Sequence, residues 1–289
     1  MFNAAPYSFS LRVPREISQV KFKTPVSQIV LSPTSMRWSP DFLDMVRVYC
    51  EQFPGVLPEK WGWQEPLNRV FDAQNLEMLI PDSNECETID WQRKTRPKAE
   101  GSFRVRWLSM SPKVMDTHAS VNVTVELGDV EQDSLVASLK ALSMCVRADF
   151  AVLEVLTESY RGFAMESGSA PYGDRFMLST HVLRHWLPDV FWGTVFGAPY
   201  VKLFGKDRLL SAPVAIAEEI GEDMVYIQLT ERLIDTVNSP SAVQQCRVQV
   251  KKHLGIDAFF ESGRGYDRLK RGPVGDVFMV PQFELLVND

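Results

Sequence analysis

Three segments of the chain carry apolar residues at every third or fourth position, the spacing that places them on one face of an α-helix. These segments are residues 39–53, 131–147 and 239–254. Their apolar positions are Phe42, Val46, Tyr49, Cys50 and Phe53; then Leu135, Leu139, Leu142 and Val146; then Val243, Cys246, Val250 and Leu254. The first and third segments begin with Ser-Pro, which suits an N-cap followed by the first helical position. We therefore predict three amphipathic helices.

Four other segments show either the period-two alternation or the short apolar run that is typical of β-strands. They are residues 26–31, 103–110, 119–127 and 151–156. With the first two helices they follow the order βαββαβ. That order is the ferredoxin-like arrangement, a four-stranded antiparallel sheet with two helices on one face. Residues 54–101 form a long insertion after the first helix, which we expect to be largely irregular because it is rich in aromatic residues and proline.

The predicted fold class is α+β, and the chain divides into three parts. Residues 1–25 form an irregular N-terminal arm, residues 26–160 the βαββαβ unit, and residues 161–289 a second, smaller α+β half packed on the first. The segments SPDFLDMVRV (39–48) and SPSAVQQCRV (239–248) share Ser-Pro and Arg-Val. This match is a weak sign of internal duplication.

Further elements of the second half follow from the same patterns. Residues 175–186 have helical spacing, and residues 277–286 read as a late strand. Residues 214–220 and 224–229 are β-prone and flank Gly221-Glu222. We therefore predict a hairpin at that position.

Composition and charge narrow the classes of function. The 289 residues are 45% hydrophobic and 24% charged, as in ordinary globular proteins. The net charge is −6 and the isoelectric point is about 5.4. An acidic chain argues against binding nucleic acid or an anionic membrane, and it permits a basic protein partner.

The sequence also bears on the cellular compartment in which the protein resides. Residues 1–11 lack the basic and apolar regions of a secretory signal, and no apolar run reaches about 18 residues. Four cysteines, Cys50, Cys86, Cys145 and Cys246, lie far apart without a C-x-x-C pair. This favours reduced thiols over a disulfide framework or a zinc site. We expect a cytoplasmic protein with no membrane partner.

Catalytic motifs are weak throughout the chain. His181 and His185 are four residues apart, so on a helix they would share a face, as two metal ligands must. No Glu stands between them in the H-E-x-x-H pattern, and no nucleophile elbow or phosphate-binding loop is present. We therefore expect no enzymatic activity, no metal and no cofactor. A small-molecule-binding protein, or an unrecognised hydrolase that uses the two histidines, stays open as an alternative.

Acidic clusters are the strongest candidates for a binding surface. The proposed hairpin tip carries four acidic residues, and the segment 81–90 carries a second group. The candidate partner-binding residues are Glu218, Glu219, Glu222 and Asp223, followed by Glu85, Glu87 and Asp90. Exposed carboxylates steer a basic partner towards a surface. The alternative is ordinary charge that keeps the protein in solution.

Two indoles in KWGWQEPLN (60–68) form a second group of candidates. Trp61 and Trp63 could anchor a protein partner, because Trp is enriched at binding hot spots. They could instead pin their loop to the sheet. The second interpretation is favoured, because no basic groove or set of ligand-binding polar groups accompanies them.

Three segments resemble bacterial immunity proteins of polymorphic toxin systems. They are PEKWGWQEPLNRVFD (58–72), RKTRPKAEGSFRVRW (93–107) and LPDVFWGTVFGAPYVKLFGKDRL (187–209). The layout is similar to families encoded beside type VI secretion effectors, above all the immunity protein 52 family, whose partners are nuclease toxins. The resemblance spans about residues 40–255, and the opening helix pattern of that family is absent from residues 1–38.

The resemblance implies a cytoplasmic antitoxin that acts in bacterial competition. Such a protein binds a cognate toxin, here a basic nuclease, and occludes its active site through protein–protein contacts. It is neither an enzyme nor a nucleic-acid binder. Two alternatives stay open: an effector chaperone or adaptor of a secretion system, and a small-molecule-binding protein.

Overall fold

The computed structural model describes most of the chain. The described residues are 20–32, 40–63, 65–80, 88–104, 118–158, 160, 171–172, 175–176, 178, 182–183, 185–261 and 279–283. The α-helices in these ranges are α1 (Pro40–Gln52), α2 (Gln132–Cys145), α4 (Ala198–Phe204), α5 (Lys206–Leu210), α6 (Asp235–Asn238) and α7 (Pro240–Leu254). Short 3-10 helices are η1 (Pro54–Val56), η2 (Leu76–Leu79) and η4 (Ile256–Ala258).

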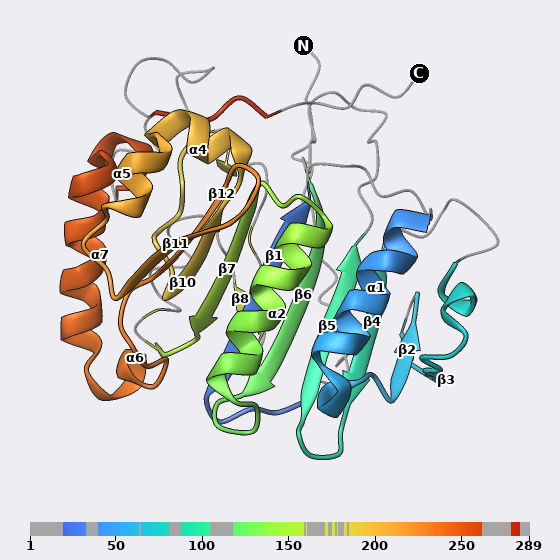
Figure 1. The fold of residues 1–289 in the computed structure, drawn as a ribbon. Coiled ribbons are helices and arrows are strands. Elements are labelled where there is room, and N and C mark those ends of the chain that lie inside the picture. Colours follow the sequence, from blue (N-terminus) through green and yellow to red (C-terminus); the bar gives the residue numbers. More distant parts are fainter. Residues whose placement is uncertain are drawn as a thin grey trace, which may run out of the picture.

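Ten of the described strands form one antiparallel sheet in the order β11-β12-β10-β7-β1-β6-β5-β4-β2-β3. Their bounds are β1 Pro25–Ser32, β2 Lys60–Gly62, β3 Arg69–Val70, β4 Thr88–Arg93, β5 Ala99–Arg104, β6 Ala119–Glu126, β7 Phe150–Val155, β10 Gly193–Phe196, β11 Ile216–Gly221 and β12 Met224–Gln228. The sheet runs from β11 on the left of Figure 1 to β3 on the right. A separate pair is formed by β8 (Pro171–Tyr172) and β9 (Arg175–Phe176).

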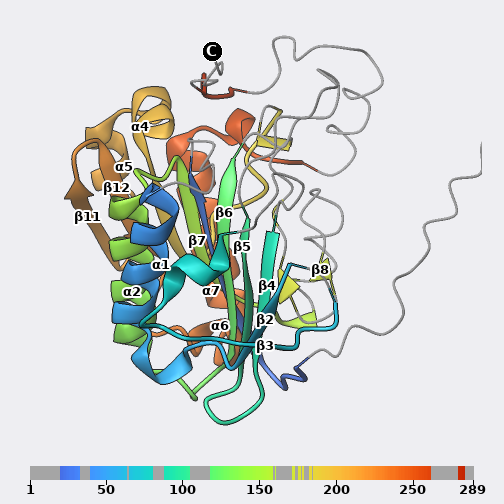
Figure 2. The same cartoon turned by 90° about the vertical axis from the view of Figure 1, so that its right-hand side faces the viewer.

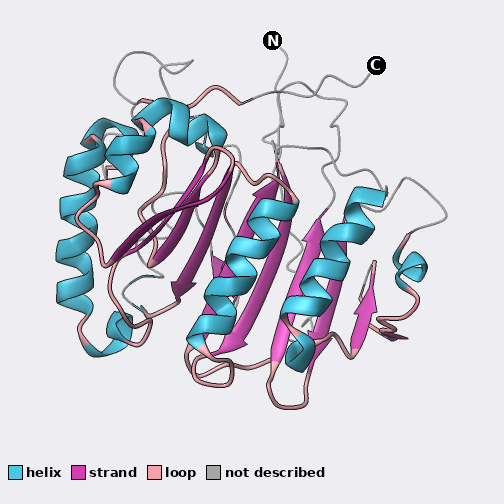
Figure 3. Ribbon diagram, in the orientation of Figure 1, coloured by secondary structure: helices cyan, strands magenta, loops and turns pink. Residues whose placement is uncertain are grey.

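The centre of the sheet has the predicted ferredoxin-like topology. In chain order the unit is β1-α1-β5-β6-α2-β7, and in the sheet its strands lie in the order β7-β1-β6-β5. Helices α1 and α2 pack together on one face, in front of the strands in Figure 3 and to one side of them in Figure 2. The α+β class and the βαββαβ order are confirmed.

The prediction that residues 54–101 are largely irregular is wrong. This insertion contains β2, β3 and β4 and the start of β5, and it extends the sheet beyond the ferredoxin-like unit. The strand predicted at 103–110 begins earlier, because β5 covers Ala99–Arg104; residues 105–110 lie outside the described ranges. The short strands β2 and β3 pair with each other, and β2 also pairs with β4.

The second part of the chain extends the other side of the sheet. Strand β10 pairs with β7, and β12 and β11 follow outwards, so the predicted hairpin is confirmed. The helix predicted at 175–186 is wrong at its start, where Arg175–Phe176 is the strand β9. The late strand predicted at 277–286 is absent from its described part, residues 279–283. The arm 1–25 is described only from residue 20, and the boundary at residue 160 and the duplication stay predictions.

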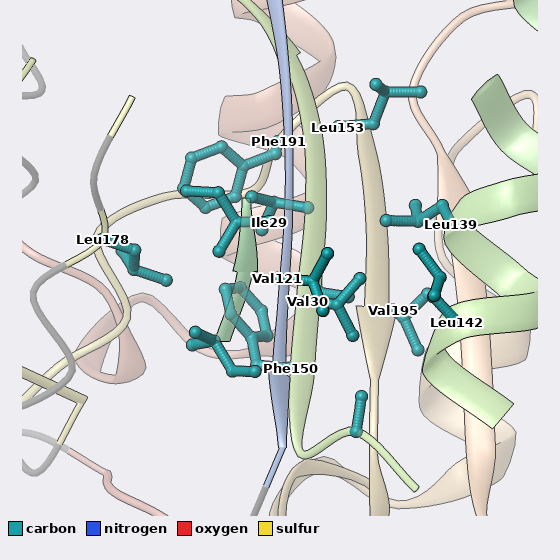
Figure 4. Close-up of a cluster of buried hydrophobic side chains, with 14 of the residues drawn as sticks. Ile29, Val30, Val121, Leu139, Leu142, Phe150, Leu153, Leu178, Phe191 and Val195 are labelled. Carbon is teal, nitrogen blue, oxygen red and sulfur yellow. The ribbon is translucent and has the colours of Figure 1, made fainter. Parts of the chain in front are cut away.

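The core lies on both faces of the sheet. The apolar stripes of the three long helices are buried, apart from Cys50 and Cys246, which are half-buried. In Figure 4 Leu153 of β7 lies on the side of α2, with Leu139 and Leu142, whereas Phe150 and Phe191 lie on the other side. Glu154, next to Leu153 in β7, therefore points away from α2, because successive side chains of a strand alternate between faces. In the described ranges, no helix combines the length and hydropathy that a membrane crossing requires.

Candidate functional site

The acidic hairpin forms one edge of the sheet. All residues of β11 are exposed or half-buried, whereas its neighbour β12 is buried along its whole length. Glu218 and Glu219 lie in β11, and Glu222 and Asp223 form the turn that leads into β12. All four side chains belong to exposed residues. The structure therefore brings these four predicted residues together on one surface, which we call the acidic hairpin.

Two lysines from neighbouring helices partly neutralise the acidic hairpin. Lys140 of α2 forms an ion pair with Glu218. The Lys206 Nζ atom of α5 lies 2.8 Å from Glu219 and 4.0 Å from Asp223. The hydrogen bond to Glu219 is the main cause that raises the pKa of Lys206. Four carboxylates thus face two ammonium groups, and Glu222 has no ion-pair partner within the described ranges.

The second acidic group does not join the hairpin. Glu85 and Glu87 lie outside the described residues, and Asp90 is a half-buried residue of β4. Six strands separate β4 from β11 in the sheet order. At about 4.8 Å per strand step, the two strands are roughly 34 Å apart. Asp90 and the acidic hairpin therefore cannot belong to one compact site.

The indole pair packs into the structure. Trp61 is fully buried in β2, and its Nε1 donates to the Val70 carbonyl at 3.3 Å. Trp63 is half-buried and donates to the Leu79 carbonyl at 3.1 Å. The two rings meet edge to face at 5.4 Å, and the Arg69 guanidinium stands 3.8 Å from the centre of the Trp63 ring. Trp61 therefore offers no surface to a partner, which corrects its selection as an anchor, and the pinned-loop interpretation holds for both rings.

The histidine pair gives no metal site that can be described. His181 lies outside the described residues, and His185 is in a turn, 5.6 Å from the Trp186 ring. Among the described residues, no group of three or more His, Cys, Asp or Glu side chains has the geometry to hold a metal ion.

A buried cluster of four charged side chains lies on the opposite face of the sheet from α2. We call Glu154, Asp189, Arg247 and Lys251 the buried charge cluster; each residue is less than a tenth exposed. Arg247 of α7 donates to Glu154 of β7, and its Nη1 lies 3.7 Å from Asp189. The Lys251 Nζ lies 2.8 Å from Asp189. Two positive and two negative side chains thus share a buried space.

Burial and mutual attraction set the protonation of this cluster. Burial raises the pKa of the Glu154 carboxyl, and the Arg247 guanidinium opposes that effect. Burial alone would lower the pKa of Arg247, but Glu154 and Asp189 more than compensate and raise it. The guanidinium also lies 4.8 Å from the centre of the Tyr160 ring. Arg247 is therefore charged at every physiological pH.

The sequence interpretation missed this cluster, although two signals were present. Arg247 lies four residues after Val243 and three before Val250, so it interrupts the apolar stripe of the third helix. Glu154 likewise interrupts the apolar run AVLEVL at 151–156. A charge at an expected core position is informative, because such a residue is almost never fully buried unless it is paired.

A cavity of about 580 Å³ opens beside the cluster. Its wall includes Glu154, Asp189 and Arg247, together with Tyr160 and the start of α7, where Ser241 and Gln244 lie in the first two turns. The cavity is thus lined both by buried charges and by the start of helix α7, which also carries Arg247.

Comparisons with known proteins give little further information. The sequence matches no protein-family model, and no curated protein is similar to it. The resemblance to the immunity protein 52 family therefore rests on the three segments alone. Among solved structures, the chain is similar to one described as Pseudomonas aeruginosa T6SS protein PA0821, at 10% sequence identity and a TM-score of 0.49. The match covers 88% of this chain and 90% of the other, and it is too distant to carry an argument about function.

Proposed function

We propose that this protein is an immunity protein that binds a cognate secreted toxin, a nuclease with a basic substrate cleft, and blocks its active site. The observation that carries the proposal is the acidic hairpin, an exposed sheet edge with four carboxylates. The resemblance of three sequence segments to immunity proteins of type VI secretion systems supports it. The chain's overall net charge of −6 has the sign that such a partner requires.

The position of the hairpin suits binding without catalysis. An edge strand presents unpaired backbone groups and outward side chains, both of which a partner can contact directly. The charges of the hairpin accelerate the encounter with a basic surface, because complementary potentials raise association rates at low salt. Glu218 and Glu219 each form an ion pair with a lysine in the unbound protein.

The test uses the product of the open reading frame adjacent to this gene as the candidate toxin. Binding would be measured by titration calorimetry at 50 mM and 500 mM salt, and protection by survival of cells that express both proteins. The double variant Glu218→Lys/Glu222→Lys reverses two charges of the hairpin. The double variant Glu51→Lys/Glu77→Lys changes the net charge equally at exposed positions of α1 and η2, and serves as the control.

We expect the hairpin variant to bind at least tenfold more weakly at low salt, with a smaller difference at high salt, where charges are screened. The control variant should bind like the wild type. Equal affinities of the two variants at both salt concentrations would reject the acidic hairpin as the binding surface. Cells that die although a stable complex forms would instead favour the effector chaperone or adaptor.

A further inference from the structure

The buried charge cluster leaves some polar atoms of Arg247 and Asp189 without a hydrogen bond. The Arg247 guanidinium has five N–H groups. Its Nη2 donates to Glu154, its Nη1 is 3.7 Å from Asp189, which is too far for a hydrogen bond, and its buried Nε has no partner. A buried donor without a partner is unfavourable, and more so when it is charged. The Nε atom is shielded from the cavity, but Arg247 lines the cavity and its Nη1 makes no hydrogen bond, so Nη1 can donate to a group that enters.

The nearby carboxylates cannot fill this need. Glu154 accepts from the backbone N–H groups of Val155 and Trp192 and from Arg247. Asp189 lies closest to Lys251, at 2.8 Å. Glu154 is held by hydrogen bonds, and Asp189 is held by its ion pair with Lys251, although its Oδ1 makes no hydrogen bond. The two negative charges are balanced by two cations.

The surroundings of the cavity favour the same kind of ligand. The first turn of α7 lines it, and the N-terminus of a helix carries a partial positive charge that favours anions. Ser241 of that turn and Gln244 of the next offer a hydroxyl and an amide as further donors. A volume of about 580 Å³ lies in the range of small-molecule sites.

We propose that this cavity binds a small molecule that bears an oxyanion, either a carboxylate or a phosphate, with the free N–H groups of Arg247 as its main donors. The inference does not depend on the toxin-binding proposal. Two strands, β10 and β12, separate β7 from β11 in the sheet, so the cavity and the acidic hairpin are different places.

Two neighbouring glutamines of α7 provide a matched pair of variants. Gln244 and Gln245 are both exposed, but only Gln244 lines the cavity. Gln244→Trp places an indole at the cavity wall, whereas Gln245→Trp adds the same ring elsewhere on the helix. Neither change touches the buried charges, so both variants should fold, and circular dichroism would verify this.

Titration calorimetry of the full chain with inorganic phosphate, succinate and glucose tests the proposal. We expect phosphate or succinate to bind the wild type, and the stronger of the two identifies the class of oxyanion. That affinity should fall at least tenfold in Gln244→Trp and stay within twofold of the wild type in Gln245→Trp. The proposal is overturned if neither oxyanion binds, if glucose alone binds, or if the two variants behave alike.

Discussion

Replacing Arg247 by leucine removes the cation at the centre of the buried charge cluster. Glu154 would keep its two backbone hydrogen bonds but would lose its only cationic partner among the described residues. Asp189 would keep Lys251. Breaking one side of a buried ion pair costs about 3–5 kcal/mol, because a charge stays buried without compensation. We expect the free energy of unfolding of Arg247→Leu to fall by an amount in this range.

That loss is a substantial fraction of the stability of a folded chain, which is typically about 5–15 kcal/mol. Urea unfolding followed by circular dichroism would give the free energy of unfolding from the midpoint and slope. The control is Arg208→Leu, because Arg208 is an exposed residue of α5. Surface changes of this kind usually stay within about 0.5 kcal/mol.

A second variant separates charge from packing. Glu154→Gln in the Arg247→Leu background removes the uncompensated charge, so the double variant should be more stable than Arg247→Leu alone. This is the sign expected for two groups that interact directly. The assignment of a buried, charged pair would be refuted if Arg247→Leu lowers the free energy of unfolding by less than about 1 kcal/mol. It would also be refuted if the double variant is less stable than Arg247→Leu.

Three further predictions concern other parts of the molecule. Gly197→Ala would place a Cβ 1.9 Å from the Ala148 carbonyl oxygen, so the free energy of unfolding in urea should fall by more than about 2 kcal/mol; an unchanged midpoint would contradict this. Burial raises the pKa of Cys50 to about 11, so iodoacetamide at pH 8 should label it at least tenfold more slowly than the exposed Cys145. Peptide mass spectrometry measures both labelling rates, and equal rates would contradict the burial of Cys50. Burial would raise the pKa of Glu59, but hydrogen bonds from Thr95 and Lys94 outweigh burial and lower the pKa. The ionised carboxylate therefore stabilises the fold above pH 4.5, and this contribution is lost as the pH falls. Glu59→Gln should therefore be less stable than the wild type at pH 7 and closer to it at pH 3 in urea unfolding, and a constant difference would contradict the shift.

The sequence predicted those elements whose pattern is local. Leu135, Leu139 and Leu142 define α2 by spacing alone, and they are buried as expected. The start of β5 was missed for a physical reason. Gly101 has no side chain because the ring of Trp91 on the neighbouring strand occupies that space; a Cβ there would lie 2.4 Å from the indole. The small residue removes the apolar signal from a position that faces the core.

The candidate sites also divide into features that are local in the sequence and features that only the fold creates. The acidic hairpin could be located from sequence, because its turn and its charges are adjacent along the chain. Its pairing with Lys140 and Lys206 could not, since the fold brings α2 and α5 to β11. Arg247 and Glu154 are 93 positions apart. Each appears in isolation as a polar residue in an apolar segment, and only the packing of α7 near β7 makes them a pair.

The contrast between β11 and β12 has a consequence for how this protein can evolve. The core at this edge is closed by the buried strand β12, and of β11 only Ala217 and Ile220, both half-buried, pack against it. Substitutions at Glu218, Glu219 or Glu222 should therefore leave folding nearly untouched, so these positions are free to drift or to follow a changing partner. An outer strand of this kind lets recognition diverge one residue at a time while the rest of the sheet stays under selection for stability.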